Sequence, residues 1–129
     1  FGDVVLDKKL GFSICSGDLL IQALSKHFKP EKVVFVIDEN GIYTANPKID
    51  KKAKLIQKTT IKELDTAIIS ADNHADVTGG MTGKIFTIKR IAKNGIVTIL
   101  VNGNKIDRLY KVLVGEKTIS TIVNGEIKK

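Results

Sequence analysis

The nine residues 76–84 read DVTGGMTGK, and a helical pattern begins directly after the two adjacent glycines. Its apolar residues recur at steps of four, three and four, as on one face of a helix: Met81, Ile85, Ile88 and Ala92. A glycine-rich loop therefore leads into a helix N-terminus, where free backbone N–H groups and the helix dipole favour an anion. Lys84 adds a positive charge one turn inside the helix. The stretch predicts a loop that binds a phosphate group.

The spacing separates this loop from two better-known phosphate-binding motifs. A Walker loop needs a glycine where this chain has Thr78, and a serine or threonine where it has Ile85. A dinucleotide-binding G-x-G-x-x-G pattern also fails, because Gly79, Gly80 and Gly83 are spaced differently. An ordinary flexible loop that caps a helix stays open as the alternative interpretation.

The composition is that of one globular domain, residues 1–129, with 43% hydrophobic and 27% charged residues. No apolar run approaches the length of a membrane span, and no signal peptide is recognisable. Cys15 is the single cysteine, which excludes an internal disulfide and favours a reducing, cytoplasmic location. Because the chain begins with Phe1 at a strand-like segment, we expect it to be a piece of a longer protein or a processed chain.

The net charge of +7 and the isoelectric point near 9.5 favour anionic partners. The lysines are spread along the whole chain, which is typical of a solvated surface rather than a nucleic-acid interface. His27 and His74 lie far apart, and no spacing of cysteine, histidine or acidic residues matches a metal site. We expect no nucleic-acid partner and no metal bound by the protein alone.

Turn and capping residues divide the chain into strands that alternate with helices. Strands are predicted at 4–6, 11–15, 32–37, 55–56, 96–101 and 118–123, with a short return after the turn at 124–125. Helices are predicted between Ser16 and Pro30 and at 61–69, 81–92 and 106–113. Thr60 and Glu63 form a capping box at the second of these helices. The first helix is expected to bury an apolar stripe: Leu20, Ala23, Leu24, His27 and Phe28.

This alternation indicates βα units. We therefore predict an α/β fold with three αβα layers, in which helices cover both faces of an open, mostly parallel sheet. The apolar, β-branched run 32–37 is typical of a parallel strand buried on both faces. Asp38 follows the carboxyl end of this strand, which is the edge where open α/β sheets bind ligands.

Five blocks of the sequence resemble, in order and spacing, the amino acid kinase superfamily and most closely its archaeal-type isopentenyl phosphate kinases. The blocks are GDVV at 2–5, SGD at 16–18, DENGIY at 38–43, DVTGGM at 76–81 with Lys84, and NGN at 102–104. The DVTGGM block is the most specific, and the resemblance spans nearly the whole chain. The main departure is at 37–41, where the family commonly has TDVDG and this chain has IDENG.

The resemblance implies the amino acid kinase fold and identifies the chain with its C-terminal, nucleotide-binding half. The implied function is ATP-dependent phosphorylation of isopentenyl phosphate to isopentenyl diphosphate, with Mg²⁺ arriving on ATP. Two alternatives stay open, because the acceptor pocket lies mostly in the other half of the family's fold. One is a superfamily kinase with a carboxylate, phosphonate or UMP acceptor, and the other is a non-catalytic nucleotide-binding domain.

The resemblance also assigns roles to individual residues. Asp18 resembles the aspartate that organises the catalytic lysines of the other half, and Gly17 resembles a contact of the substrate phosphate. The remaining matches resemble nucleotide contacts: Asp38, Tyr43, Gly79, Gly80 and Lys84. Of these, Lys84 resembles the lysine that reaches the ATP phosphates. Simpler interpretations are a helix cap for Asp18, turn formation for Asp38 and the two glycines, and exposed side chains for Tyr43 and Lys84.

The N-terminal half of the family carries a Lys-x-Gly-Gly-Ser loop, a second lysine and a glycine-rich loop with a substrate-binding histidine. None of these motifs occurs in this chain. We therefore expect the chain to be completed by a second chain, or by the rest of its own, and the complete enzyme to be a homodimer. Alone, it should bind ATP weakly and transfer no phosphoryl group, and an uncovered apolar surface should mark the place of the other half.

Overall fold

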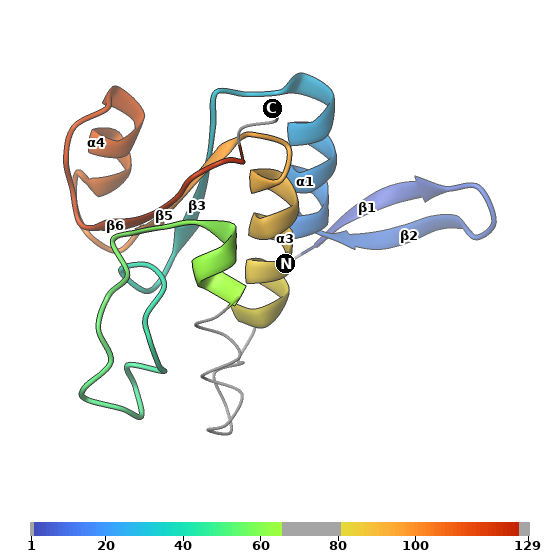
Figure 1. The fold of residues 1–129 in the computed structure, drawn as a ribbon. Helices are drawn as coiled ribbons and strands as arrows, with labels where there is room; N and C mark the ends of the chain where they lie inside the picture. The colour runs from blue at the N-terminus through green and yellow to red at the C-terminus, as the bar shows by residue number, and fades with distance from the viewer. Residues whose placement is uncertain (1, 66–80, 127–129) are drawn as a thin grey trace.

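The computed structural model describes residues 2–65 and 81–126 of the chain, which form an α/β domain with a projecting hairpin (Figure 1). The hairpin consists of β1 (Gly2–Asp7) and β2 (Gly11–Ser16). The other strands are β3 (Lys32–Ile37), β4 (Lys58–Thr59), β5 (Val97–Asn102) and β6 (Ser120–Val123). The helices are α1 (Gly17–Phe28), α3 (Met81–Ala92) and α4 (Arg108–Val114), with a short helical segment at 61–65. Every helix within the described residues is too short or too polar to cross a lipid bilayer.

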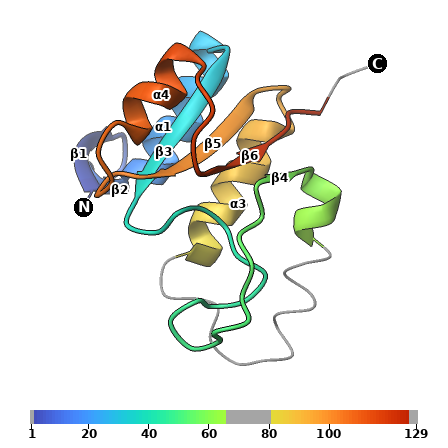
Figure 2. The ribbon, with the colours of Figure 1, turned by 90° about the vertical axis from the view of Figure 1, so that its left-hand side faces the viewer.

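Four strands form one sheet in the order β3-β5-β6-β4. Helices α1 and α3 lie on one side of this sheet and α4 on the other, as the two perpendicular views show (Figures 1 and 2). Because α1 precedes β3 and α3 precedes the parallel strand β5, both helices start at the carboxyl edge of these strands. The layers confirm the predicted α/β fold, and this edge is where the candidate site lies.

The main core lies between the sheet and α3. The predicted apolar face of α3 is confirmed, because Ile85, Ile88 and Ala92 are buried and Met81 packs against the same cluster. Leu100 of β5 and Val123 of β6 are fully buried in this cluster. Each large apolar side chain that is buried contributes about 1.5–3 kcal/mol to folding. The position of α3 on the sheet is therefore fixed by its own apolar face.

Two predicted boundary signals are confirmed in atomic detail. Glu63 accepts the Thr60 backbone N–H at 2.7 Å, and the Thr60 hydroxyl accepts the Glu63 N–H at 3.4 Å, which completes the capping box. Gly95 and Gly115 follow α3 and α4 with φ near 83°, the left-handed conformation that ends a helix. The helix predicted to continue to residue 69 can be followed only to residue 65 within the described chain.

The sheet is mostly parallel, as predicted, with one antiparallel pairing among its described strands. Strand β6 is antiparallel to β5, with Val101 opposite Ser120, and parallel to the short β4. The connection between α4 and β6 explains why β6 runs antiparallel to β5. Lys32, at the amino end of β3, donates to the carbonyls of Val112 and Leu113, so α4 ends near this edge of the sheet. The chain then returns along the sheet over 115–119 before β6 begins. The strand predicted at 55–56 is wrong: Leu55 forms a single bridge to Tyr43, and the strand lies at 58–59.

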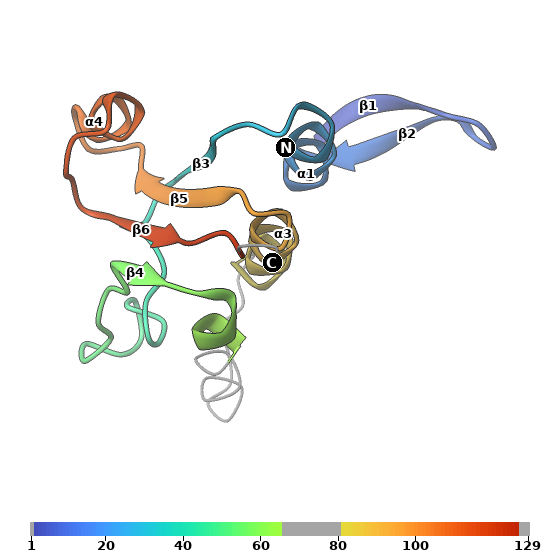
Figure 3. The same cartoon turned by 45° about the horizontal axis from the view of Figure 1, so that its top comes forward.

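The apolar stripe predicted to be buried on α1 is largely exposed, which is a second correction. Leu24 and Phe28 are 53% and 70% exposed, His27 is exposed, and the buried residue of this helix is Ser25. The reason is that α1 packs against α3 rather than lying flat on the sheet. The hairpin extends away from the body beside α1 (Figure 3) and exposes apolar cross-strand pairs, Val4 with Ile14 and Leu6 with Phe12.

Candidate functional site

Two predicted site residues, 66 positions apart, meet at the N-termini of α1 and α3. Ser16 caps α1 by accepting the Leu19 N–H at 3.3 Å, which places Asp18 in the first turn. Lys84 lies in the first turn of α3, and its Nζ atom donates to Asp18 Oδ1 at 2.7 Å. The two side chains are 23% and 29% exposed, so the ion pair is partly shielded from water. The two helices therefore build a charged pair at their common end.

The environment of this pair favours an anion next to it. The Lys84 ammonium lies 5.1 Å from the centre of the Phe35 ring, so one side of the lysine is apolar and holds the charge by a cation–π contact. Two helix N-termini point their partial positive charge at the same place. Among the described residues Asp18 accounts for one hydrogen bond of an ammonium that has three donors, and the other donors can bind a ligand.

A second polar cluster lies at the carboxyl ends of β3 and β5. The Asn102 amide donates to the Asp38 carbonyl at 2.9 Å, and the Asn40 amide donates to the Tyr43 hydroxyl at 3.1 Å. The Asp38 carboxylate is 74% exposed and lies 4.0 Å from the Lys48 ammonium. The structure thus brings both predicted residues of this block, Asp38 and Tyr43, to the predicted edge of the sheet.

Thr121 fixes the loop that follows β3 and carries Asn40 and Tyr43. The Thr121 hydroxyl accepts the Ile42 N–H at 2.8 Å and donates to the Ile56 carbonyl at 2.6 Å. Gly41 passes directly over it with φ near 147°, where a Cβ atom would come within 2.3 Å of the hydroxyl oxygen. A glycine is therefore required here, and Asn40 and Tyr43 are fixed on either side of it.

The remaining predicted residues stand as follows. Gly17 is the first residue of α1 and is exposed beside Asp18. Gly79 and Gly80 lie outside the described residues. Among the residues that the structure describes, no group of three acidic, histidine or cysteine side chains could hold a metal ion.

The sequence did not indicate three residues at this edge of the sheet: Asn102 and Arg108 both donate to the side-chain oxygen of Asn40. Asn102 lies in the NGN block at 102–104, whose resemblance to the family assigns no role to its residues. Asn40 lies where the DENGIY block departs from the family pattern, which was a usable signal. Arg108 carried no signal, because an arginine at a helix start is usually solvated.

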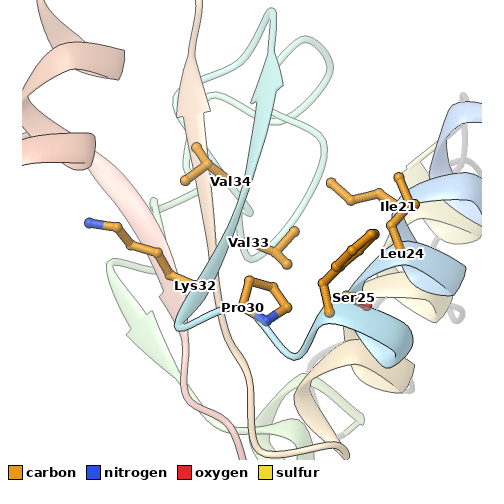
Figure 4. Close-up of a pocket in the computed structure, with 8 residues that line it drawn as sticks. Ile21, Leu24, Ser25, Pro30, Lys32, Val33 and Val34 are labelled. Carbon is orange, nitrogen blue, oxygen red and sulfur yellow. The ribbon is translucent and has the colours of Figure 1, made fainter.

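An apolar groove of about 290 Å³ lies at the opposite edge of the sheet, between the end of α1 and the start of β3 (Figure 4). Ile21, Leu24 and Val33 line it together with the ring of Pro30. Its walls offer no charge to a phosphate except the Lys32 ammonium, which is bonded to α4. The groove is therefore separate from the charged site.

Comparisons with known proteins agree with this architecture. The family model of the amino acid kinase family matches residues 1–102. An isopentenyl phosphate kinase of Methanothermobacter thermautotrophicus is 38% identical over 130 residues, which cover 98% of this chain and 48% of that protein. A glutamate 5-kinase of Nitrosospira multiformis is 26% identical over 88% of this chain and 30% of that protein.

A solved structure of isopentenyl phosphate kinase superimposes on 95% of this chain and 44% of its own length, with a TM-score of 0.72 and 31% identity. The chain thus spans about half the length of the curated isopentenyl phosphate kinases that it matches over most of its own length. Since the family model covers most of the chain and the fold agrees with it, the chain belongs to the amino acid kinase family.

Proposed function

We propose that this chain is the nucleotide-binding half of an ATP-dependent isopentenyl phosphate kinase. The observation that carries the proposal is the pair formed by Lys84 and Asp18 at two helix N-termini, in a chain 38% identical to an isopentenyl phosphate kinase. In the reaction, an oxygen of the acceptor's phosphate attacks the γ-phosphorus of ATP. The bond from that phosphorus to the bridging oxygen breaks, so that ADP leaves and a diphosphate forms.

Phosphoryl transfer depends on positioning and on stabilising negative charge, and the chain's residues suit both tasks. The Lys84 ammonium binds the phosphates of the nucleotide, while Asp18 holds that ammonium in place without contacting the reacting atoms. The free N–H of Gly17, at the start of α1, binds a phosphate oxygen of the acceptor. Asp38 and Tyr43 bind the nucleoside part, and Gly79 and Gly80 are further nucleotide contacts.

Magnesium is proposed to arrive with the nucleotide. The described residues offer no set of three metal-binding side chains, so phosphate oxygens and water molecules would supply most of its ligands. The ion would neutralise negative charge on the phosphates, in addition to the charge that Lys84 supplies.

The exposed apolar surfaces support a proposal about the partner. Leu6, Phe12 and Ile14 of the hairpin and Leu24 and Phe28 of α1 are all more than half exposed. Together with the half-length match to the relatives, they favour a second half of the kinase, in this or another chain, that covers these surfaces. We further propose that the complete enzyme is a homodimer located in the cytoplasm, where Cys15 would stay reduced.

The acceptor has a second candidate, because a glutamate 5-kinase also matches most of this chain. A carboxylate acceptor would use the same nucleotide half with a different acceptor pocket. The higher identity, 38% against 26%, favours isopentenyl phosphate.

The test is an acceptor panel assayed with the protein completed by its other half. Isopentenyl phosphate, glutamate and UMP are offered with ATP, and ADP release and product mass are measured. We expect diphosphate formation from isopentenyl phosphate, no transfer by Lys84→Ala, and no transfer by residues 1–129 alone. Turnover of glutamate but not of isopentenyl phosphate would identify glutamate as the acceptor. Binding of ATP without turnover of any acceptor would support a non-catalytic domain.

A further inference from the structure

The polar cluster at the carboxyl ends of β3 and β5 is centred on the side chain of Asn40. Its Oδ1 atom accepts from Arg108 Nη1 at 2.5 Å and from Asn102 Nδ2 at 3.3 Å. Its Nδ2 atom donates to the Tyr43 hydroxyl oxygen at 3.1 Å. One amide therefore connects a cation, a second amide and a tyrosine that the proposed function places on the nucleoside.

The direction of the hydrogen bonds that Asn40 makes is fixed by its two donors, of which the charged Arg108 guanidinium is the closer. A guanidinium only donates, so Asn40 must present its oxygen to Arg108 and its NH₂ group to Tyr43. Asn102 is fixed in the same sense, because its Oδ1 accepts the backbone N–H of Asn104 at 2.9 Å and its NH₂ group faces Asn40. The Tyr43 oxygen therefore accepts from Asn40, and within the described part of the chain its own O–H is left to donate to a ligand.

We propose that Tyr43 is a hydrogen-bond donor to an acceptor atom of the nucleotide, a ring nitrogen or a ribose oxygen. Arg108 is the positioning residue that sets this polarity through Asn40. The proposal rests on the proposed function, since it assumes that a nucleotide occupies this edge of the sheet. It assigns nucleotide recognition to Arg108, which lies on α4 and outside the sequence motifs.

The burial and charge of the cluster support this role. Tyr43, Asn40 and Arg108 are each half-buried, so they are held in place yet reach the surface. Among the ion pairs of the described residues none involves Arg108, whose guanidinium meets the neutral Asn40 amide instead. An aspartate at position 40 would neutralise Arg108, but it could only accept hydrogen bonds. Tyr43 would then donate inward, and its O–H would be lost to the ligand.

The test compares Asn40→Asp with Tyr43→Phe and with the double variant, in the protein completed by its other half. Affinity for ATP is measured by calorimetry. We expect each single variant to lose about three- to tenfold in affinity, the contribution of one hydrogen bond, and the double variant to lose no more than either. Arg108→Met, which removes the donor, should weaken binding similarly, and Arg108→Lys should restore most of it.

A ligand-free readout keeps the proposal separate from the proposed function. In a Tyr110→Phe background Tyr43 is the one remaining tyrosine of residues 1–129, and a difference spectrum against the Tyr43→Phe variant isolates its signal in the completed protein. The intensity ratio of its Raman doublet reports whether the hydroxyl accepts or donates, and it should fall in Asn40→Asp. An unchanged ratio, or additive losses of ATP affinity in the double variant, would overturn the proposal. If native protein binds no ATP at all, the proposed function fails first, and every variant is then equally inactive.

Discussion

Replacing Asp18 by asparagine separates the role of its charge from its role in capping α1. The variant keeps the size of the side chain and an oxygen that can accept from Lys84. It removes the negative charge that holds the Lys84 ammonium at 2.7 Å. If the carboxylate positions Lys84 for phosphate binding, the rate of phosphoryl transfer should fall far more than the affinity for nucleotide.

The magnitude follows from the shielding of the pair. A hydrogen bond to a charged group contributes about 1.5–3 kcal/mol, and the retained acceptor and remaining solvent screening reduce the loss. Since both side chains are less than a third exposed, we expect the free energy of unfolding to fall by about 1–2 kcal/mol. For a chain of this length, that lowers Tm by roughly 3–8 °C. A lysine displaced by about 1 Å costs on the order of 100-fold in rate.

The assay measures turnover of isopentenyl phosphate and ATP affinity in the completed kinase, with Tm measured on the same samples. Asp65→Asn is the matched control, because Asp65 pairs with Lys89 of the same helix α3 at a more exposed position. It should cost less than about 0.5 kcal/mol and leave turnover unchanged. A normal rate for Asp18→Asn together with a lowered Tm would leave Asp18 with a structural role only.

Three further substitutions test the framework of the site. Gly41→Ala should lower the free energy of unfolding by about 2–4 kcal/mol in urea titration, because its Cβ would meet the Thr121 hydroxyl, which already makes two hydrogen bonds. The control Gly83→Ala, whose Cβ would meet open space, should be neutral or stabilising, and equal stabilities of the two variants would contradict this reasoning. Hydrogen bonds from Thr60 hold the pKa of Glu63 below its ordinary value of 4.5, so the stability that this carboxylate contributes is present above that pH and lost as the pH falls. The urea midpoint of Glu63→Gln should therefore depend less on pH between 6 and 3 than that of the native chain, and parallel pH profiles of the two proteins would refute the reasoning. Lys32→Met should cost about 1 kcal/mol in thermal unfolding by releasing two carbonyls at the end of α4, and an unchanged Tm would show that these bonds contribute nothing.

The elements whose signals are local could be predicted from the sequence. The apolar face of α3, the capping box at Thr60 and the left-handed glycines after α3 and α4 depend on residues a few positions apart. The edge of the sheet that carries Asp38 and Tyr43 was also predicted, because it follows from the alternation of strands and helices. These signals do not depend on how distant segments pack.

The features that depend on distant segments were missed. The periodicity of α1 gave an apolar face but not its partner, so Leu24 and Phe28 were predicted to be buried. The direction of β6 depends on the path of residues 115–119, for which the sequence has no local signal. No local signal in the sequence indicated that Asp18 pairs with Lys84 of this chain, and its expected contact with lysines of the other half stays a prediction.

The most direct test of the account is a structure of the completed kinase with a non-hydrolysable ATP analogue. We predict a phosphate oxygen of the analogue within about 3 Å of Lys84 Nζ, with the Asp18 bond retained and the nucleoside beside Tyr43. A nucleotide bound elsewhere, with Lys84 bonded to Asp18 alone, would contradict the central claim that this pair forms the phosphate site.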